Sequence, residues 1–343
     1  MKALVLDKYK QLNYRDFPDP EINNGEVLIE VKACGICGSD VHGMDGSTGR
    51  RKPPLVMGHE ASGIIIDKGS DVKDWHIGDR VTFDSTVYPL NDWFTLKGRY
   101  NLSDNRQVLG VSPGEYRRHG AFAEKVAVPQ HILYRIPEGV SFIEAAMVEP
   151  VAVAAHAINN SRMDPGSSAL VAGTGMVGIF IVRLLKIFGA DPVIAFDIDN
   201  NKLDMARDFG ADFVFNTKDN NTALEILKLT KNRGADIAFE AVGISETVQL
   251  CLNNVRKGGT AVLVGNLSPK IEFPLQNIVT REITVQGSCA INGEYELVLD
   301  LLAAKKLEVD KLISTVAPLS EGAEWFNRLY NKEPGLNKII LTP

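Results

Sequence analysis

The segment from residue 169 to residue 197 constrains the fold of this chain more than any other. Residues 169–173 are apolar, predict a short buried strand, and lead into the glycine pattern Gly173-Thr-Gly-Met-Val-Gly178. Apolar residues then recur at helical spacing until Gly189, and Val193–Asp197 predicts a second strand. A glycine pattern between a strand and an amphipathic helix is typical of a dinucleotide-binding site.

Each residue of this pattern has a physical task in such a site. Gly173 makes the tight turn, Gly175 lets the backbone approach a pyrophosphate, and Gly178 lets helix and strand pack closely. The helix that begins around Met176 and Val177 offers unpaired N–H groups and its positive dipole to the phosphates. These five residues are the predicted phosphate-binding part of the site.

Asp197 is the predicted ribose-binding residue. It ends the second strand, 19 residues after Gly178. An acidic group at about this distance binds the ribose hydroxyls of NAD. Residues 198–201 contain no arginine for a 2′-phosphate, which favours NAD over NADP. In the alternative interpretation the glycines only turn a strand into a helix, and Asp197 caps a helix or lies on the surface.

The pattern of predicted elements divides the chain into two domains. Residues 1–150 contain short strands broken by Gly, Pro and Asp, which predicts a β-rich, barrel-like domain. Residues 151–286 alternate strands and helices, which predicts a doubly wound parallel sheet and an α/β fold. Residues 287–343 return to mixed character, and we expect them to pack on the first domain.

Composition excludes several functional classes. The chain has 343 residues, a formal net charge of −6 and no basic run, so we expect no nucleic-acid partner and no anionic membrane surface. Four cysteines are too few for a disulfide scaffold. Neither a signal peptide nor a membrane span is expected, and these features together predict a cytoplasmic protein.

Candidate metal ligands occur at three places in the first domain. They lie in Cys37-Gly-Ser39-Asp-Val-His42, in Gly58-His59-Glu60 and in Glu149-Pro150. A catalytic zinc takes three protein ligands and keeps one position open, and thiolate, imidazole and carboxylate all suit it. Taken singly, a cysteine or histidine is more often a core or surface residue.

These motifs, together with Gly120-Ala-Phe-Ala-Glu124 and the glycine pattern, have the order and spacing of one family. The whole chain resembles the zinc-dependent medium-chain dehydrogenases. The resemblance implies a GroES-like catalytic domain from residues 1–150 and 287–343, with a Rossmann NAD-binding domain, residues 151–286, inserted between them. It places the catalytic zinc on Cys37, His59 and either Glu60 or Glu149. Glu149-Pro150 is similar to the polyol (sorbitol or galactitol-1-phosphate) dehydrogenase branch.

The resemblance also implies a reaction. A secondary alcohol of a polyol, sugar or sugar derivative would pass a hydride to NAD, with zinc as the Lewis acid. Ser39 would take the alcohol proton and His42 would pass it to solvent. Glu60 would be a zinc ligand or a neighbour of the zinc. Members of the family assemble, so we expect a homodimer or homotetramer.

The chain departs from the family at a second zinc site. Many relatives carry a structural zinc on four cysteines, and here those positions hold Pro89, Asp92, Thr95 and Ser103. We therefore predict one catalytic zinc and no structural zinc. We expect packing to hold this lobe instead, through the apolar residues Val87, Tyr88, Leu90, Trp93, Phe94 and Leu102.

Substrate identity stays open at this point. Arg50 or Arg51 would pair with a phosphate or carboxylate on the substrate, or would be solvated loop charges. The alternatives are an L-threonine 3-dehydrogenase-like enzyme or another zinc alcohol dehydrogenase. A zinc-free reductase and a non-catalytic nucleotide-binding protein are further alternatives, and the intact ligand and glycine positions count against both.

Overall fold

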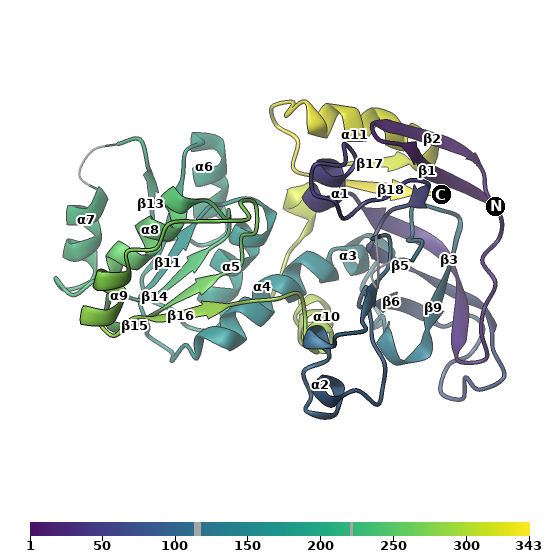
Figure 1. Cartoon of the computed structure of the whole chain (residues 1–343), viewed down its shortest axis with the longest axis horizontal. Helices are drawn as coiled ribbons and strands as arrows, with labels where there is room; N and C mark the ends of the chain where they lie inside the picture. The colour runs from purple at the N-terminus through teal and green to yellow at the C-terminus, as the bar shows by residue number, and fades with distance from the viewer. Residues whose placement is uncertain (113–117, 220–221) are drawn as a thin grey trace. The chain divides into compact units, whose positions relative to one another are not determined.

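The computed structural model describes residues 1–112, 118–219 and 222–343. The chain forms two compact units, Met1–Glu149 with Ile291–Pro343, and Pro150–Ala290 (Figure 1). From the sequence we expected the boundaries between the two domains to lie at 150/151 and 286/287. Among the described residues, no helix combines the length and apolar character needed to cross a membrane.

The first unit is built from β-sheets. The largest has the strand order β10-β6-β5-β3-β18-β17, with β9 also pairing with β3, and the smaller ones are β2-β1-β4 and β7-β8. The strands are β1 (Lys2–Lys8), β2 (Gln11–Asp16), β3 (Glu26–Gly35), β4 (Leu55–Val56), β5 (Glu60–Lys68), β6 (Arg80–Phe83), β7 (Thr86–Val87), β8 (Gln107–Val108), β9 (Lys125–Pro129), β10 (Leu133–Arg135), β17 (Ile313–Pro318) and β18 (Lys338–Thr342).

Short helices connect these strands. The α-helices of the first unit are α1 (Gly38–Gly43), α2 (Trp93–Leu96), α3 (Phe142–Ala146), α10 (Tyr295–Ala303) and α11 (Gly322–Tyr330). Its 3₁₀ helices are η1 (Tyr100–Leu102), η3 (Gln130–Ile132), η4 (Asp310–Leu312) and η5 (Leu319–Glu321). Helix α4 (Val148–Ser161) begins in this unit and continues in the second.

Strand β3 is the centre of the large sheet. Its alternating sequence buries Val27, Ile29 and Val31 on one face, as a strand with a single apolar face requires. It pairs antiparallel with β5, β9 and β18. The C-terminal strand β18, yellow in Figure 1, therefore lies beside the purple N-terminal strand β3.

The second unit contains a parallel sheet of six strands in the order β13-β12-β11-β14-β15-β16. This order is the 3-2-1-4-5-6 arrangement of the Rossmann fold. The strands are β11 (Ala169–Ala172), β12 (Val193–Asp197), β13 (Phe213–Asn216), β14 (Ala235–Glu240), β15 (Val255–Leu263) and β16 (Thr284–Gly287). The helices are α5 (Met176–Ile187), α6 (Asn200–Asp208), α7 (Thr222–Leu229), α8 (Ser245–Asn254) and α9 (Leu275–Thr280).

The lobe at residues 87–103 is held only in part as we predicted. Leu90 and Trp93 are 61% and 66% exposed, so packing does not fix these two side chains. Instead the ring of Tyr88 stacks on Tyr100 with centroids 4.2 Å apart, and the Tyr100 hydroxyl donates to the buried Asp84 at 2.7 Å. Val87 and Tyr88 do pack on the hydrophobic core of the first unit, and the hydrogen bonds and the aromatic stack add to these contacts.

Asp92 organises helix α2 in this lobe. Its carboxylate accepts hydrogen bonds from the backbone N–H of Phe94 at 2.7 Å and of Thr95 at 3.1 Å, as an N-cap does. The hydroxyl of Thr95 donates to the other oxygen at 2.9 Å. Two of the positions where relatives carry cysteines are thus joined by a hydrogen bond.

Candidate active site

Cys37 lies between the end of β3 and the start of α1. Its backbone is extended and its thiol caps the helix, accepting from the backbone N–H of Ser39 at 3.4 Å. The Ser39 hydroxyl donates to the same sulfur at 3.2 Å. The sulfur is thus an acceptor held in place at the end of a sheet strand.

Glu60 is the first residue of β5, the strand next to β3, and His59 directly precedes it. Both side chains are buried, at 6% and 0% exposure. The register pairs Glu60 with Gly35 of β3, two residues before Cys37. Neighbouring strands therefore bring the two motifs together across the sheet.

Cys37, His59 and Glu60 form a candidate metal centre. One ligand atom from each lies within 4.8 Å of the others. Oε1 of Glu60 is buried and has no hydrogen-bond partner, although buried carboxylate oxygens normally have one. A thiolate, an imidazole and a carboxylate are a donor set that zinc prefers, with room for a fourth ligand. The described residues fit the metal.

Asp40 is a functional residue that our sequence reasoning did not single out. It is fully buried, and its Oδ2 lies 3.2 Å from Nδ1 of His59, a close charge contact without hydrogen-bond alignment. Arg51 donates to its other oxygen, Oδ1, at 2.6 and 2.9 Å. A carboxylate behind a ligating histidine fixes the orientation of the ring. Because Asp40 lies inside the Cys37–His42 motif, its position in the sequence could have identified it as a candidate site residue.

The charges around His59 show what this site requires. Burial alone would lower the pKa of His59, but the facing Asp40 and Cys37 outweigh it and hold the pKa well above the ordinary value. Burial would raise the pKa of Asp40, and His59 and Arg51 outweigh it in turn and keep that carboxyl ionised. The site favours a positive charge between these groups, which a divalent cation supplies.

Arg51 is not available to a substrate. Its side chain is 3% exposed, and its charge is paired with Asp40. It also donates to the Ser39 hydroxyl at 3.3 Å. Neither alternative that we gave for Arg51, a substrate partner or a solvated loop charge, is therefore correct, whereas Arg50 is exposed.

A buried lysine from the C-terminal strand also reaches the candidate metal centre. Lys338 donates to Oε2 of Glu60 at 2.6 Å and to the carbonyl oxygen of Ile36 at 3.1 Å. Burial would lower the pKa of Lys338, but the carboxylate of Glu60 and the thiol of Cys37 raise it above its ordinary value. Because 278 residues separate the pair, no local sequence pattern could have revealed it.

Glu149 lies outside the group of three ligands, at the start of α4. Its side chain is partly buried. Burial and the charge of Glu60 raise its pKa to about 8, against the opposing charges of His59 and Lys338. The charges of the candidate metal centre thus influence the pKa of Glu149, although Glu149 is not one of the three clustered ligands.

Ser39 and His42 lie on the same short helix, α1, three residues apart, so they share one face. Both are exposed. Only the Ser39 hydroxyl touches the metal centre, through its hydrogen bond to Cys37.

The glycine pattern of the second unit forms the turn between β11 and α5. Gly173 has a φ of +91°, which an L side chain rarely adopts. A Cβ on Gly178 would lie 1.8 Å from the carbonyl oxygen of Gly173, so the third glycine is required for the close approach. A Cβ on Gly175, the N-cap of α5, meets no atom within 4 Å. Met176 and Val177 follow as the first residues of that helix. This is the open backbone cradle that a pyrophosphate needs.

Asp197 stands at the end of β12, beside this turn. Its Oδ2 accepts from the backbone N–H of Thr174 at 2.8 Å and from the Thr174 hydroxyl at 3.1 Å. Its Oδ1 accepts from the N–H groups of Ile198 and Asp199 at 2.8 and 3.1 Å. The carboxylate therefore also braces the turn, and a ribose hydroxyl would replace the rotatable hydroxyl of Thr174.

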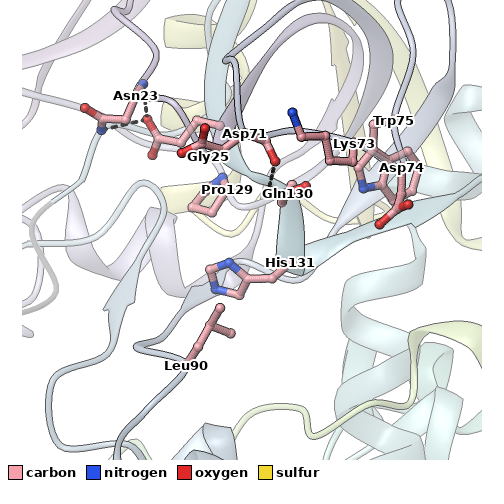
Figure 2. Close-up of a pocket in the computed structure, with 11 residues that line it drawn as sticks. Asn23, Gly25, Asp71, Lys73, Asp74, Trp75, Leu90, Pro129, Gln130 and His131 are labelled. Atoms are coloured by element: carbon pink, nitrogen blue, oxygen red, sulfur yellow. Dashed lines mark hydrogen bonds between the residues drawn. The ribbon is translucent and has the colours of Figure 1, made fainter.

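A surface pocket of about 650 Å³ in the first unit contains none of the predicted site residues (Figure 2). His131 lines it, and burial lowers the pKa of this histidine. Its Nε2 lies 3.1 Å from the carbonyl oxygen of Tyr88. His131 therefore supports the lobe at residues 87–103.

Comparison with known proteins agrees with this geometry. Residues 23–138 match the alcohol dehydrogenase GroES-like domain, and residues 176–304 match the zinc-binding dehydrogenase family. The sorbitol dehydrogenase of Bacillus subtilis (strain 168) is 32% identical over 348 residues, covering 100% of this chain and 97% of that protein.

Solved structures cover the whole chain as well. Galactitol-1-phosphate dehydrogenase from Escherichia coli has a TM-score of 0.92 at 27% identity, covering 100% of both chains. A zinc-binding dehydrogenase from Sinorhizobium meliloti 1021, bound to NADP, has a TM-score of 0.90 at 30% identity, covering 100% of this chain and 99% of that one.

The chain belongs to the zinc-binding dehydrogenases of the medium-chain family. It is an oxidoreductase with a GroES-like domain and a Rossmann-type parallel sheet, and the fold and family predicted from the sequence motifs are confirmed.

Proposed function

We propose that this dehydrogenase oxidises a secondary alcohol of a polyol, sugar or sugar derivative and passes the hydride to NAD. The convergence of Cys37, His59 and Glu60 within 4.8 Å carries the proposal. We assign these three residues as the ligands of one zinc ion. When bound, zinc supplies a Lewis acid that lowers the pKa of an alcohol hydroxyl.

Ser39 is the proposed proton acceptor. Its hydroxyl is exposed and lies against the ligand sulfur of Cys37 at 3.2 Å, so it borders the open side of the metal centre. Arg51 donates to the same oxygen and helps to orient it. We assign His42, exposed on the same face of α1, to hand the proton on to solvent.

Glu60 and Glu149 receive different roles in this proposal. Glu60 offers an unpartnered buried oxygen to the metal. Glu149 lies outside the cluster of ligand atoms, and we assign it to the water or substrate next to the metal. Glu149→Gln should keep stoichiometric zinc and lose turnover, whereas Glu60→Gln should lose zinc.

The cofactor preference rests on Gly173, Gly175, Gly178 and the two acids at the end of β12. Asp197 and the exposed Asp199 would repel a 2′-phosphate, which supports NAD. The Sinorhizobium relative is bound to NADP, so NADP is the competing cofactor. We expect a lower KM for NAD than for NADP.

A substrate panel tests the reaction. NADH absorbance is followed with free polyols, phosphorylated polyols, sugar acids, L-threonine and simple alcohols, in the wild-type protein and in Cys37→Ser. A polyol class that turns over only in the wild type supports the proposal. Turnover retained in Cys37→Ser contradicts zinc catalysis and favours a zinc-free reductase. Silence of a zinc-loaded wild type across all polyols and sugars contradicts the substrate class.

Of the two arginines that the sequence suggested for a phosphorylated substrate, Arg50 remains the candidate. Arg50 is exposed and precedes the buried Arg51. If Arg50 binds a phosphate, Arg50→Gln raises KM for a phosphorylated polyol and leaves KM for the free polyol unchanged.

We also propose a cytoplasmic homodimer or homotetramer with one zinc per chain. Strand β16 is an edge of the parallel sheet and is available to pair with a second copy. Sedimentation analysis measures the number of chains in the assembly, and metal quantification measures the number of zinc ions per chain. A monomer, or a second bound zinc, would contradict the proposal.

A further inference from the structure

Lys338 is a buried cation with one charged partner. It begins β18, its side chain is 3% exposed, and its Nζ donates to Oε2 of Glu60 at 2.6 Å. A second donation, to the carbonyl oxygen of Ile36 at 3.1 Å, fixes the direction of the ammonium group. Lysine is almost never fully buried unless it is paired, so this side chain needs Glu60 as a partner.

The two oxygens of Glu60 are thereby made unequal. Oε2 accepts from Lys338, while Oε1 is buried without a hydrogen-bond partner. Glu60 is also the residue that joins Cys37 and His59 in the group of ligand atoms within 4.8 Å. Since Oε2 is already held by the ammonium group, Oε1 is the oxygen left for a cation.

A second observation concerns the position of Oε2 of Glu60. A Cβ on Gly35, which pairs with Glu60 across β3 and β5, would lie 2.4 Å from Oε2. The carboxylate therefore occupies space above a position that has no side chain. Gly35 also pairs with Ile340 of β18, so the strand that carries Lys338 closes the opposite side.

We propose that Lys338 is a positioning residue of the metal centre, which holds Oε2 of Glu60 so that Oε1 alone is presented beside Cys37 and His59. This inference rests on the proposed zinc site. A glutamate that offers one oxygen leaves a coordination position open for substrate, as a catalytic zinc requires. The nearby ammonium also offsets one of the two negative charges that Cys37 and Glu60 bring to the metal.

Cobalt substitution tests the proposal, because the visible absorption of Co²⁺ reports its coordination. Lys338→Met removes the donor. The loss of its charge alone would strengthen the attraction for a cation, so a Co²⁺ dissociation constant about 10- to 100-fold higher than that of the wild type, with an altered visible band, is the result we expect from the loss of positioning. Lys338→Arg keeps a charged donor, so its Co²⁺ dissociation constant and its visible band should both be closer to those of the wild type. Gly35→Ala crowds the same oxygen and should alter the band while Lys338 is intact.

Two further variants make the test specific. Leu341→Val truncates another buried side chain of β18, so it should lower the thermal unfolding temperature and leave the cobalt band unchanged. Cys37→Ser tests the zinc site itself, and unaltered cobalt binding there would overturn the proposed function. If Cys37→Ser loses the metal but Lys338→Met has the wild-type band and a dissociation constant within threefold, the role of Lys338 is overturned. If Lys338→Met does not fold, an unaltered band in Gly35→Ala overturns it.

Discussion

The buried pair of Asp40 and Arg51 allows a test of how the metal centre is held. Their side chains are 0% and 3% exposed, and Arg51 donates twice to one carboxylate oxygen. Removing one partner of such a pair costs about 3–5 kcal/mol, because the other charge stays buried without compensation. His59 remains beside Asp40, so we expect Arg51→Met to lower the free energy of unfolding by about 3 kcal/mol, the lower end of that range.

Asp40→Asn separates the two roles of this carboxylate. It leaves Arg51 buried without a counter-charge, so stability should fall by a similar amount. It also weakens the contact behind His59, and metal affinity should fall about 10- to 100-fold. In the double variant Asp40→Asn/Arg51→Met neither charge remains, so most of the stability should return while metal affinity stays low.

Calorimetric unfolding with a chelator measures the stability terms, and a separate metal titration measures affinity. For a unit of this size, 3 kcal/mol corresponds to a shift of about 6–12 °C. Arg15→Met is the control, because its pair with Asp7 is only partly buried, at 41% and 27% exposure, and pairs near the surface are worth about 1 kcal/mol or less. The reasoning is refuted if Arg51→Met unfolds within 1 kcal/mol of the wild type, or if the double variant is as unstable as the two single losses added together.

Three further predictions follow from the same structure. Gly178→Ala should abolish NADH binding in a fluorescence titration, because its Cβ collides with Gly173. Gly175→Ala should fold normally and still lose cofactor affinity. Normal NADH binding in both variants would contradict the proposed pyrophosphate site. Asp197→Ala should raise KM for NAD about 10- to 100-fold through the loss of charge-assisted hydrogen bonds, and leave KM for NADP nearly unchanged. Burial raises the pKa of Asp84 to about 6 from 3.8, so its contribution to stability is complete below pH 3.8 and is lost as pH rises through 6, by at most about 3 kcal/mol. Asp84→Asn should flatten that slope in metal-free protein, and an unchanged slope would count against the pKa.

The Rossmann-type unit could be predicted closely because its signals are local. The strand Val193–Asp197 has the bounds expected from its apolar run, and the helix after the glycine pattern begins at Met176. Buried parallel strands form continuous apolar runs between turn residues, which a sequence shows directly. Long-range pairing in the first unit, such as β18 on β3, leaves no comparable local pattern.

The candidate metal centre could be predicted in part. Motifs located Cys37, His59 and Glu60, but a choice between Glu60 and Glu149 depends on where β5 and α4 place the two side chains. The roles of Asp40 and Arg51 depend on burial: Arg51, for which we had left open a substrate partner or a solvated loop charge, is the buried partner of a carboxylate. Charged residues are assigned to the surface by default, so a buried one is misassigned until its partner is known.

These missed residues set the electrostatics of the whole site. Around the metal position lie three groups that carry negative charge when the thiol is ionised, Cys37, Glu60 and Asp40, and two buried cations, Arg51 and Lys338. The protein alone is therefore short of one positive charge there, which agrees with the raised pKa of His59. A divalent cation reverses the balance and leaves a net charge of about +1, because it replaces the proton that His59 would otherwise bind. If zinc binds as we propose, that surplus would favour ionisation of the substrate alcohol, and without Lys338 the surplus would vanish. In this proposal, Lys338 would contribute to the charge of the site as well as to the position of Glu60.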